Sequence, residues 1–145
     1  MQTLVQPYLF FDGRCEEALD FYRRTLDAEV QVVMRYKDGP QPMRGPDGSE
    51  PPADKVMHAA MKIGETQILA SDGFAKGMPS FQGFSLSYSA RDEADAKRRF
   101  GALAEGGQVR MPLTETFFAK SFGMLADRFG VQWMVIAGPK RDNPQ

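Results

Sequence analysis

Residues 115–136 read ETFFAKSFGMLADRFGVQWMVI and contain the most specific pattern in the chain. Large side chains alternate with smaller ones over 118–125, which is the period of two expected of a strand with two distinct faces. Asp127 and Gly130 then provide turn chemistry, because aspartate bonds its own backbone and glycine accepts a positive φ. Residues 131–136 are nearly all apolar and rich in strand formers around Trp133. The stretch therefore predicts a hairpin of two strands.

The composition around this hairpin limits the classes of protein to consider. A chain of 145 residues can form a single domain, 1–145, with a proper core. Lysine and arginine number 18 against 19 acidic residues, so no basic surface for nucleic acid is expected. No apolar run approaches the length that spans a bilayer, and Cys15 is the single cysteine, which excludes an internal disulfide. We expect a cytoplasmic protein without nucleic-acid or membrane partners.

The chain before the hairpin alternates between strand and helix patterns. Apolar residues recur at helical spacing from Cys15 to Leu26, with acidic residues in the first turn and basic residues near the end. A second helix is predicted over 92–105, ending at Gly106 and Gly107. Strands are predicted over 4–11, 28–36, 56–63, 66–71, 84–89 and 108–113.

Residues 37–54 hold five of the ten prolines together with three glycines, so they cannot form regular structure. Two interpretations remain open for this loop. It is either an excursion without a role or a lid over a site, because long loops in compact domains are often functional.

The order of these elements repeats, since each half of the chain reads strand, helix and three strands. Four identities at one constant spacing support the repeat: Leu26 with Leu103, Gln31 with Gln108, Val32 with Val109, and Met34 with Met111. We therefore expect two βαβββ modules, at 4–72 and 83–137, joined by a linker at 73–82. A helix would cover one face of each sheet and leave the other face to a cleft.

Several motifs resemble the PhnB-like branch of the vicinal oxygen chelate superfamily, which includes glyoxalase I, extradiol dioxygenases, fosfomycin resistance proteins and bleomycin-binding proteins. The motifs are PYLFFDG, EEALDFYRRTL, VMHAAMKIG, ILASD and ETFFAKSFGMLADRFGVQWMV, and they span about residues 6–136. The resemblance implies an α+β fold of two βαβββ modules with curved mixed sheets that enclose a cavity. It also implies a small-molecule ligand and a homodimer.

Enzymes of this superfamily hold a divalent metal with His, Gln or Glu from the first and last strands of each module. A metal needs about three or more converging protein ligands. The glutamate of the last strand, four residues after Gly130, is replaced by Met134, whose thioether is a poor ligand for a hard cation. The other positions hold Ala70, Ser85 or Ser87, and Gln6. Asp72 could supply one carboxylate in a shifted register. We expect no cofactor and a metal-free cavity, with Gln6 and Asp72 as the less favoured metal ligands.

His58, the sole histidine, is the candidate catalytic residue, as a general base or a hydrogen-bond partner. The alternative is a structural histidine. Alternation places His58 opposite Met57, Ala59 and Met61, so it would face the cavity if those residues pack under the helix. Further candidates for ligand binding are the aromatic residues Tyr8, Phe118, Phe122 and Trp133 and the charged residues Glu115 and Lys120. Each aromatic could equally be core, and each charged residue could be a solvated edge.

The leading functional hypothesis is a protein that binds or transforms a small organic molecule without a metal. The alternatives are a metal-dependent enzyme of the glyoxalase or dioxygenase type and a drug-binding homodimer of the resistance type. Some relatives carry a methyltransferase label. We set that label aside, because no segment resembles the glycine-rich strand-to-helix turn that binds an adenosyl cofactor.

Overall fold

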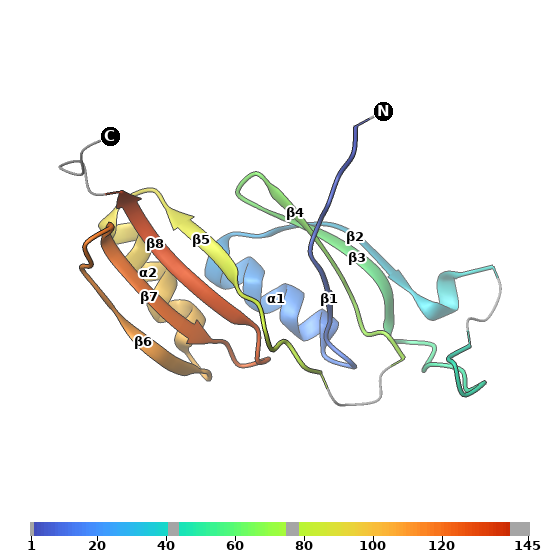
Figure 1. The fold of residues 1–145 in the computed structure, drawn as a ribbon. Helices are drawn as coiled ribbons and strands as arrows, with labels where there is room; N and C mark the ends of the chain where they lie inside the picture. The colour runs from blue at the N-terminus through green and yellow to red at the C-terminus, as the bar shows by residue number, and fades with distance from the viewer. Residues whose placement is uncertain (1, 41–43, 75–78, 140–145) are drawn as a thin grey trace. The chain divides into compact units, whose positions relative to one another are not determined.

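The computed structural model describes residues 2–40, 44–74 and 79–139. The chain divides into two compact units, Met1–Pro79 and Ser80–Gln145. Each unit has the element order β-α-β-β-β and a four-stranded mixed sheet (Figure 1). The predicted repeat of strand, helix and three strands is therefore confirmed. The module ranges predicted from the sequence, 4–72 and 83–137, fall within these two units.

The first unit contains β1 (Tyr8–Phe10), α1 (Cys15–Leu26), β2 (Glu29–Arg35), β3 (Val56–Ile63) and β4 (Thr66–Ser71). Its strand order is β1-β4-β3-β2, in which β1 is parallel to β4 and the other neighbours are antiparallel. The strand predicted over 4–11 is too long, since only Tyr8–Phe10 pairs with β4. Pro7 has no N–H to donate to a sheet, and residues 2–5 are exposed.

The second unit contains β5 (Leu86–Ala90), α2 (Glu93–Ala104), β6 (Gln108–Thr114), β7 (Ala119–Ala126) and β8 (Gln132–Pro139). The order β5-β8-β7-β6 corresponds to that of the first unit, with β5 parallel to β8. Strands β7 and β8 form the predicted antiparallel hairpin, and the backbone N–H of Asp127 donates to the carbonyl of Val131 across its turn. Gly130 has the positive φ, +90°, that its turn position requires. Neither sheet closes on itself.

One irregularity occurs at the same place in both units. The pairing of β2 with β3 shifts register between Val30 and Val32, and the pairing of β6 with β7 shifts between Val109 and Met111. Matching these shifts aligns Val30 with Val109, whereas the sequence identities align Val32 with Val109. The identities therefore reveal the repeat but give a register slightly different from that of the strands.

Each helix covers one face of its own sheet. The α1 helix has the predicted bounds, and its buried residues are Cys15, Ala18, Leu19, Phe21, Tyr22, Thr25 and Leu26. The α2 helix, which was predicted over 92–105, buries Ala96, Phe100 and Leu103, and it lies behind β7 and β8 in Figure 1. Alternate strand residues pack beneath the helices, among them Ala59, Met61, Leu125 and Val135, which have almost no exposed surface. The other face of each sheet is only partly covered.

The proline-rich loop begins with a short 3-10 helix, Tyr36–Asp38. Within the described part of the loop, residues 44–54 form turns held by backbone bonds such as Gly45 N–H to the carbonyl of Ser49. Residues 41–43 lie outside the described residues. Over the described ranges, the structure contains no helix with the length and apolar character needed to cross a bilayer.

Candidate functional site

Two residues predicted for a site come together on the partly covered face of the first sheet. The hydroxyl of Tyr8, on β1, lies 3.1 Å from Nδ1 of His58, on β3. The two ring centroids are 5.8 Å apart, and the Tyr8 ring also stacks on Phe10 at 5.0 Å. Tyr8 is 37% exposed and His58 is half-buried, so both can be reached from solvent. The pair is therefore available to a ligand.

The orientation of His58 agrees with the strand alternation predicted from the sequence. Ala59 and Met61 are fully buried on the helix side, whereas His58 lies on the opposite face beside its cross-strand neighbour Met34. Met34 is 39% exposed. The hydrogen bond to Tyr8 involves one ring nitrogen, and no described residue hydrogen-bonds Nε2 of His58. The imidazole can thus exchange a hydrogen bond or a proton with a ligand while Tyr8 holds its ring.

The residues named as possible metal ligands have structural partners. Both carboxylate oxygens of Asp72, a residue only 1% exposed, accept backbone hydrogen bonds. Oδ1 accepts from the N–H groups of Gly13 and Cys15, and Oδ2 accepts from that of Val56, each at 2.8 Å. The amide of Gln6 donates to Oε1 of Gln67 at 2.7 Å. Over residues 2–40, 44–74 and 79–139, no three His, Cys, Asp or Glu side chains converge as a metal site requires. Asp72 and Gln6 thus both take part in hydrogen bonds within the first unit.

Cys15 is fully buried at the start of α1. Burial raises the pKa of its thiol, and the nearby carboxylates of Asp72 and Glu16 raise it further. Because the thiolate is the reactive form, this environment suits a packing role rather than nucleophilic chemistry.

Among the hairpin candidates, Phe118 and Phe122 are brought together, with ring centroids 5.1 Å apart in an edge-to-face contact. Phe118 is 36% exposed and Phe122 is 8% exposed. Glu115 and Lys120 are exposed on the surface of the same unit.

Trp133 lies in the core, which is the alternative that its sequence position left open. Its side chain is 3% exposed, and its indole N–H donates to Oδ2 of Asp127 at 2.9 Å. The other carboxylate oxygen of Asp127 accepts from the backbone N–H groups of Phe129 and Val131. Asp127 is therefore more than a turn residue, because it joins the turn to the buried tryptophan.

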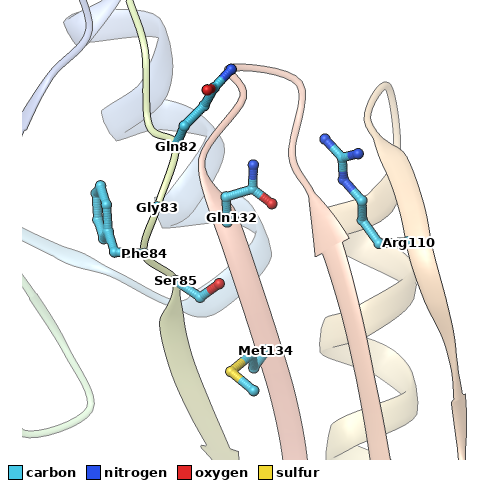
Figure 2. A pocket seen from close by; sticks show the side chains of 7 residues that line it. All are labelled: Gln82, Gly83, Phe84, Ser85, Arg110, Gln132 and Met134. Atoms are coloured by element: carbon cyan, nitrogen blue, oxygen red, sulfur yellow. The ribbon is translucent and has the colours of Figure 1, made fainter.

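A pocket of about 660 Å³ in the second unit was not predicted from the sequence. Its lining comes from the segment before β5, from β6 and from β8 (Figure 2). The residues are Gln82, Gly83, Phe84, Ser85, Arg110, Gln132 and Met134. In the sequence, Ser85 and Met134 stood out only as positions where related enzymes hold a metal. Alternation along β8 could have placed Gln132 beside Met134, but the position of Arg110 depends on the register shift in β6.

Two mixed sheets of this topology, each covered by one helix, define the class of protein as the glyoxalase/bleomycin resistance/dioxygenase fold. A domain of that description from Frankia sp. EAN1pec shares the fold, with a TM-score of 0.64 at 16% identity. The similarity covers 99% of this chain and 96% of that domain. The resemblance identified from the sequence motifs is thus confirmed at the level of fold.

The particular family follows from sequence. The family described as 3-demethylubiquinone-9 3-methyltransferase matches residues 3–136, and the chain belongs to it. Protein YjdN of Escherichia coli (strain K12) is 35% identical over 136 residues, which are 90% of this chain and 92% of that protein.

Two solved structures are similar throughout. Protein PA1353 from Pseudomonas aeruginosa is 40% identical, with a TM-score of 0.80 over 94% of this chain and 98% of that one. The PhnB protein from Bacillus cereus is 27% identical, with a TM-score of 0.77 over 94% of this chain and 100% of that one. The PhnB-like assignment is therefore confirmed.

Proposed function

We propose that this PhnB-like protein binds or transforms a small organic molecule on the partly covered face of its first sheet. The observation that carries the proposal is the hydrogen-bonded pair of Tyr8 and His58. Small-molecule sites usually combine a largely apolar lining with a few polar groups that fix the ligand's orientation. Phe10 stacks on Tyr8, and Met34 lies across from His58, so apolar side chains surround the polar pair.

The chemistry available to this pair is the exchange of a proton or a hydrogen bond. An imidazole such as that of His58 can accept or donate a proton, and the hydroxyl of Tyr8 can donate a hydrogen bond to it or accept one from it. Ligands with a hydroxyl, carbonyl or enol oxygen beside an apolar body fit this arrangement.

The site is proposed to work without a metal. Two features support this part of the proposal: Met134 stands where related enzymes carry a glutamate, and both carboxylate oxygens of Asp72 accept hydrogen bonds from backbone N–H groups. Metal analysis of the purified protein should give less than one divalent ion per chain. One bound ion per chain, retained after dialysis, would favour the alternative of a metal-dependent glyoxalase or dioxygenase type.

The family's name refers to a methyltransferase, and this activity is not carried over to the chain. In the described residues, the parallel strand pairs are β1 with β4 and β5 with β8, each inside a mixed sheet. The doubly wound parallel sheet and glycine-rich turn that bind an adenosyl cofactor in Rossmann proteins have no counterpart in these sheets.

The experiment uses the single histidine as its reporter. Phenols, enols and aryl carbonyl compounds are titrated into the protein while the imidazole resonances of His58 are followed by NMR. We expect at least one compound to shift these resonances with a saturable affinity. His58→Ala should lower the affinity for that compound by about tenfold, which is the effect of removing one hydrogen bond.

Lys62→Ala is the matched control, because Lys62 is exposed on the same strand and the same face as His58. The Lys62→Ala variant should bind the compound with the affinity of the wild type. Equal affinities for the wild type and His58→Ala would overturn the proposal. A Tyr8→Phe variant with weaker binding would assign part of the effect to the hydroxyl that orients the ring.

We also propose that the protein is a cytoplasmic homodimer. The free and buried thiol of Cys15 is compatible with a reducing compartment. Exposed apolar side chains on the outermost strands, including Val33 on β2 and Val109 on β6, favour coverage by a second copy. The drug-binding alternative shares this assembly, and binding of a cationic drug by the dimer would support it.

A further inference from the structure

The pocket of the second unit contains one charged side chain, that of Arg110. We propose that Arg110 binds the carboxylate of a small organic anion whose apolar body lies against Phe84 and Met134. The inference goes beyond the function proposed for His58 and does not depend on it, since every residue involved belongs to the second unit.

The first observation is the direction of the Arg110 side chain. On either side of it, Val109 is paired with Leu125 and Met111 with Met124, so Arg110 is the extra residue of a bulge. Leu125 is buried beneath α2, whereas Met124 is half-buried on the opposite face. Bulges redirect side chains, often beside functional sites. Here the bulge leaves Arg110 lining the same pocket as Gln132 and Met134, as Figure 2 shows.

The second observation is that the guanidinium of Arg110 lacks a counterion among the described residues. Eight other arginines have a carboxylate partner within 4.0 Å: Arg14, Arg23, Arg35, Arg44, Arg91, Arg98, Arg99 and Arg128. Arg24 lies over the ring of Phe21. No acidic residue lines the pocket. The fold thus pairs its other described arginines and leaves Arg110 available to an anion from solution.

The third observation is the chemistry of the remaining lining. A guanidinium presents parallel N–H groups that match the two oxygens of a carboxylate. The amides of Gln82 and Gln132 and the hydroxyl of Ser85 add neutral donors, so they can satisfy further oxygen atoms without adding charge. Phe84, 47% exposed, and Met134 supply apolar surface. One cation with two apolar neighbours favours a monoanion with an aromatic or aliphatic body.

The competing explanation is that Arg110 only protects a sheet edge. Strand β6 is the outermost strand of its sheet, and natural proteins often place charged side chains on such strands to prevent edge-to-edge association. A protective charge would bind carboxylates no better than other exposed cations. The two explanations therefore differ in affinity and in selectivity for a carboxylate.

The test compares benzoate, phenylacetate and acetate with benzamide, which has the shape of benzoate without its charge. Binding to the 145-residue chain is measured by calorimetry and by backbone amide NMR. We expect benzoate or phenylacetate to bind saturably, and benzamide and acetate to bind at least about tenfold more weakly. Arg110→Gln should lower the affinity for the aromatic carboxylate by about tenfold or more and leave the affinity for benzamide unchanged.

Arg110→Lys keeps the charge but loses the two-pronged geometry, so we expect an intermediate affinity. Lys97→Gln removes the same charge from an exposed position on α2 outside the pocket, and it should bind like the wild type. Amide NMR spectra of each variant confirm that the fold is retained.

Three results would overturn the proposal. The first is the absence of saturable carboxylate binding, and the second is equal binding by the wild type and Arg110→Gln. The third is displacement of benzoate by inorganic phosphate at equal concentration, which indicates an unselective anion site.

Discussion

At the scale of single residues, Asp72 illustrates how a side chain with ligand chemistry can be used by the fold itself. Its two oxygens accept three backbone N–H bonds from the start of α1 and from β3. In Asp72→Asn an amide NH₂ group would face at least one of these donors. We expect a loss of about 1–3 kcal/mol in the free energy of unfolding, the cost of an unsatisfied buried polar group. Urea-induced unfolding measures this loss.

The matched control is Asp54→Asn, because the Asp54 side chain is 87% exposed and its ion pair with Lys37 is long, at 3.6 Å. Its unfolding free energy should change by less than about 0.5 kcal/mol. Equal effects of the two substitutions would contradict the structural role given to Asp72.

The residues that could be predicted are those whose orientation follows from simple alternation. His58 faces away from the helix because its neighbours along β3 are apolar on the other side, and this pattern was visible in the sequence. The hydrogen bond between Tyr8 and His58 could not be predicted in this way, because the two residues are 50 positions apart in the sequence and lie on different strands. Arg110 was missed because a bulge interrupts the alternation on which such predictions depend.

At the scale of elements, the packing of α2 on β7 depends on the absence of a side chain at Gly123. A Cβ built there would lie 2.7 Å from Cε2 of Phe100 and 3.0 Å from the Cα of Leu113. Because Phe100 is buried and Leu113 would have to move its backbone, Gly123→Ala should lower the unfolding free energy by about 1–3 kcal/mol. Urea unfolding gives this value.

Gly101 provides the opposite control within α2. A Cβ at this exposed position meets no atom within 4 Å, so Gly101→Ala should raise the unfolding free energy by about 1 kcal/mol through helix propensity. If both substitutions stabilise the protein, the close packing assigned to Gly123 is wrong.

The first turn of α2 should give the protein a characteristic acid sensitivity. Burial alone would raise the pKa of Asp95, but hydrogen bonds from the backbone and guanidinium of Arg91 and from the hydroxyl of Tyr88 outweigh it and lower the pKa to about 2. The unfolded chain, with an ordinary aspartate value of 3.8, binds the proton first as the pH falls. The stabilisation is therefore complete above about pH 4 and is lost between about pH 4 and pH 2.

This dependence is measured by unfolding the wild type and Asp95→Asn at intervals from pH 5 to pH 2. We expect the variant to be less stable at pH 5 and to lose less stability on acidification than the wild type. Glu93→Gln removes an exposed carboxylate from the same turn and should follow the wild-type curve. The same slope for Asp95→Asn and the wild type would contradict the assignment.

The elements themselves were largely predictable. Residues 56–63 and 66–71 form strands with the predicted bounds, since both segments alternate and end at glycine or aspartate. The first strand was shorter than predicted because an apolar, strand-forming sequence pairs only where a neighbouring strand exists. Propensity alone does not report the partner.

At the scale of the whole molecule, the repeat and the sequence motifs were sufficient to predict the fold class, because the order of elements is a property of the entire chain. The pocket lined by Arg110 was not predictable at this scale. It depends on the segment before β5 lying beside β8, and no local signal in the sequence marks that contact. The family match over residues 3–136 identifies the fold, as the order of elements does. The chemistry of the protein still depends on individual side chains.

The outermost strands of both sheets bear on how the chain assembles. Strands β2 and β6 are outermost in their sheets, yet they expose Val33 at 39% and Val109 at 45%. Apolar side chains on an uncovered edge promote association, so we expect light scattering to give the mass of two chains. Val33→Lys or Val109→Lys should shift the mass toward one chain, whereas Val5→Lys, at a 92% exposed position outside the strands, should not. A single-chain mass at all concentrations would contradict the homodimer, and a dimer that resists both edge substitutions would place its interface elsewhere on the surface.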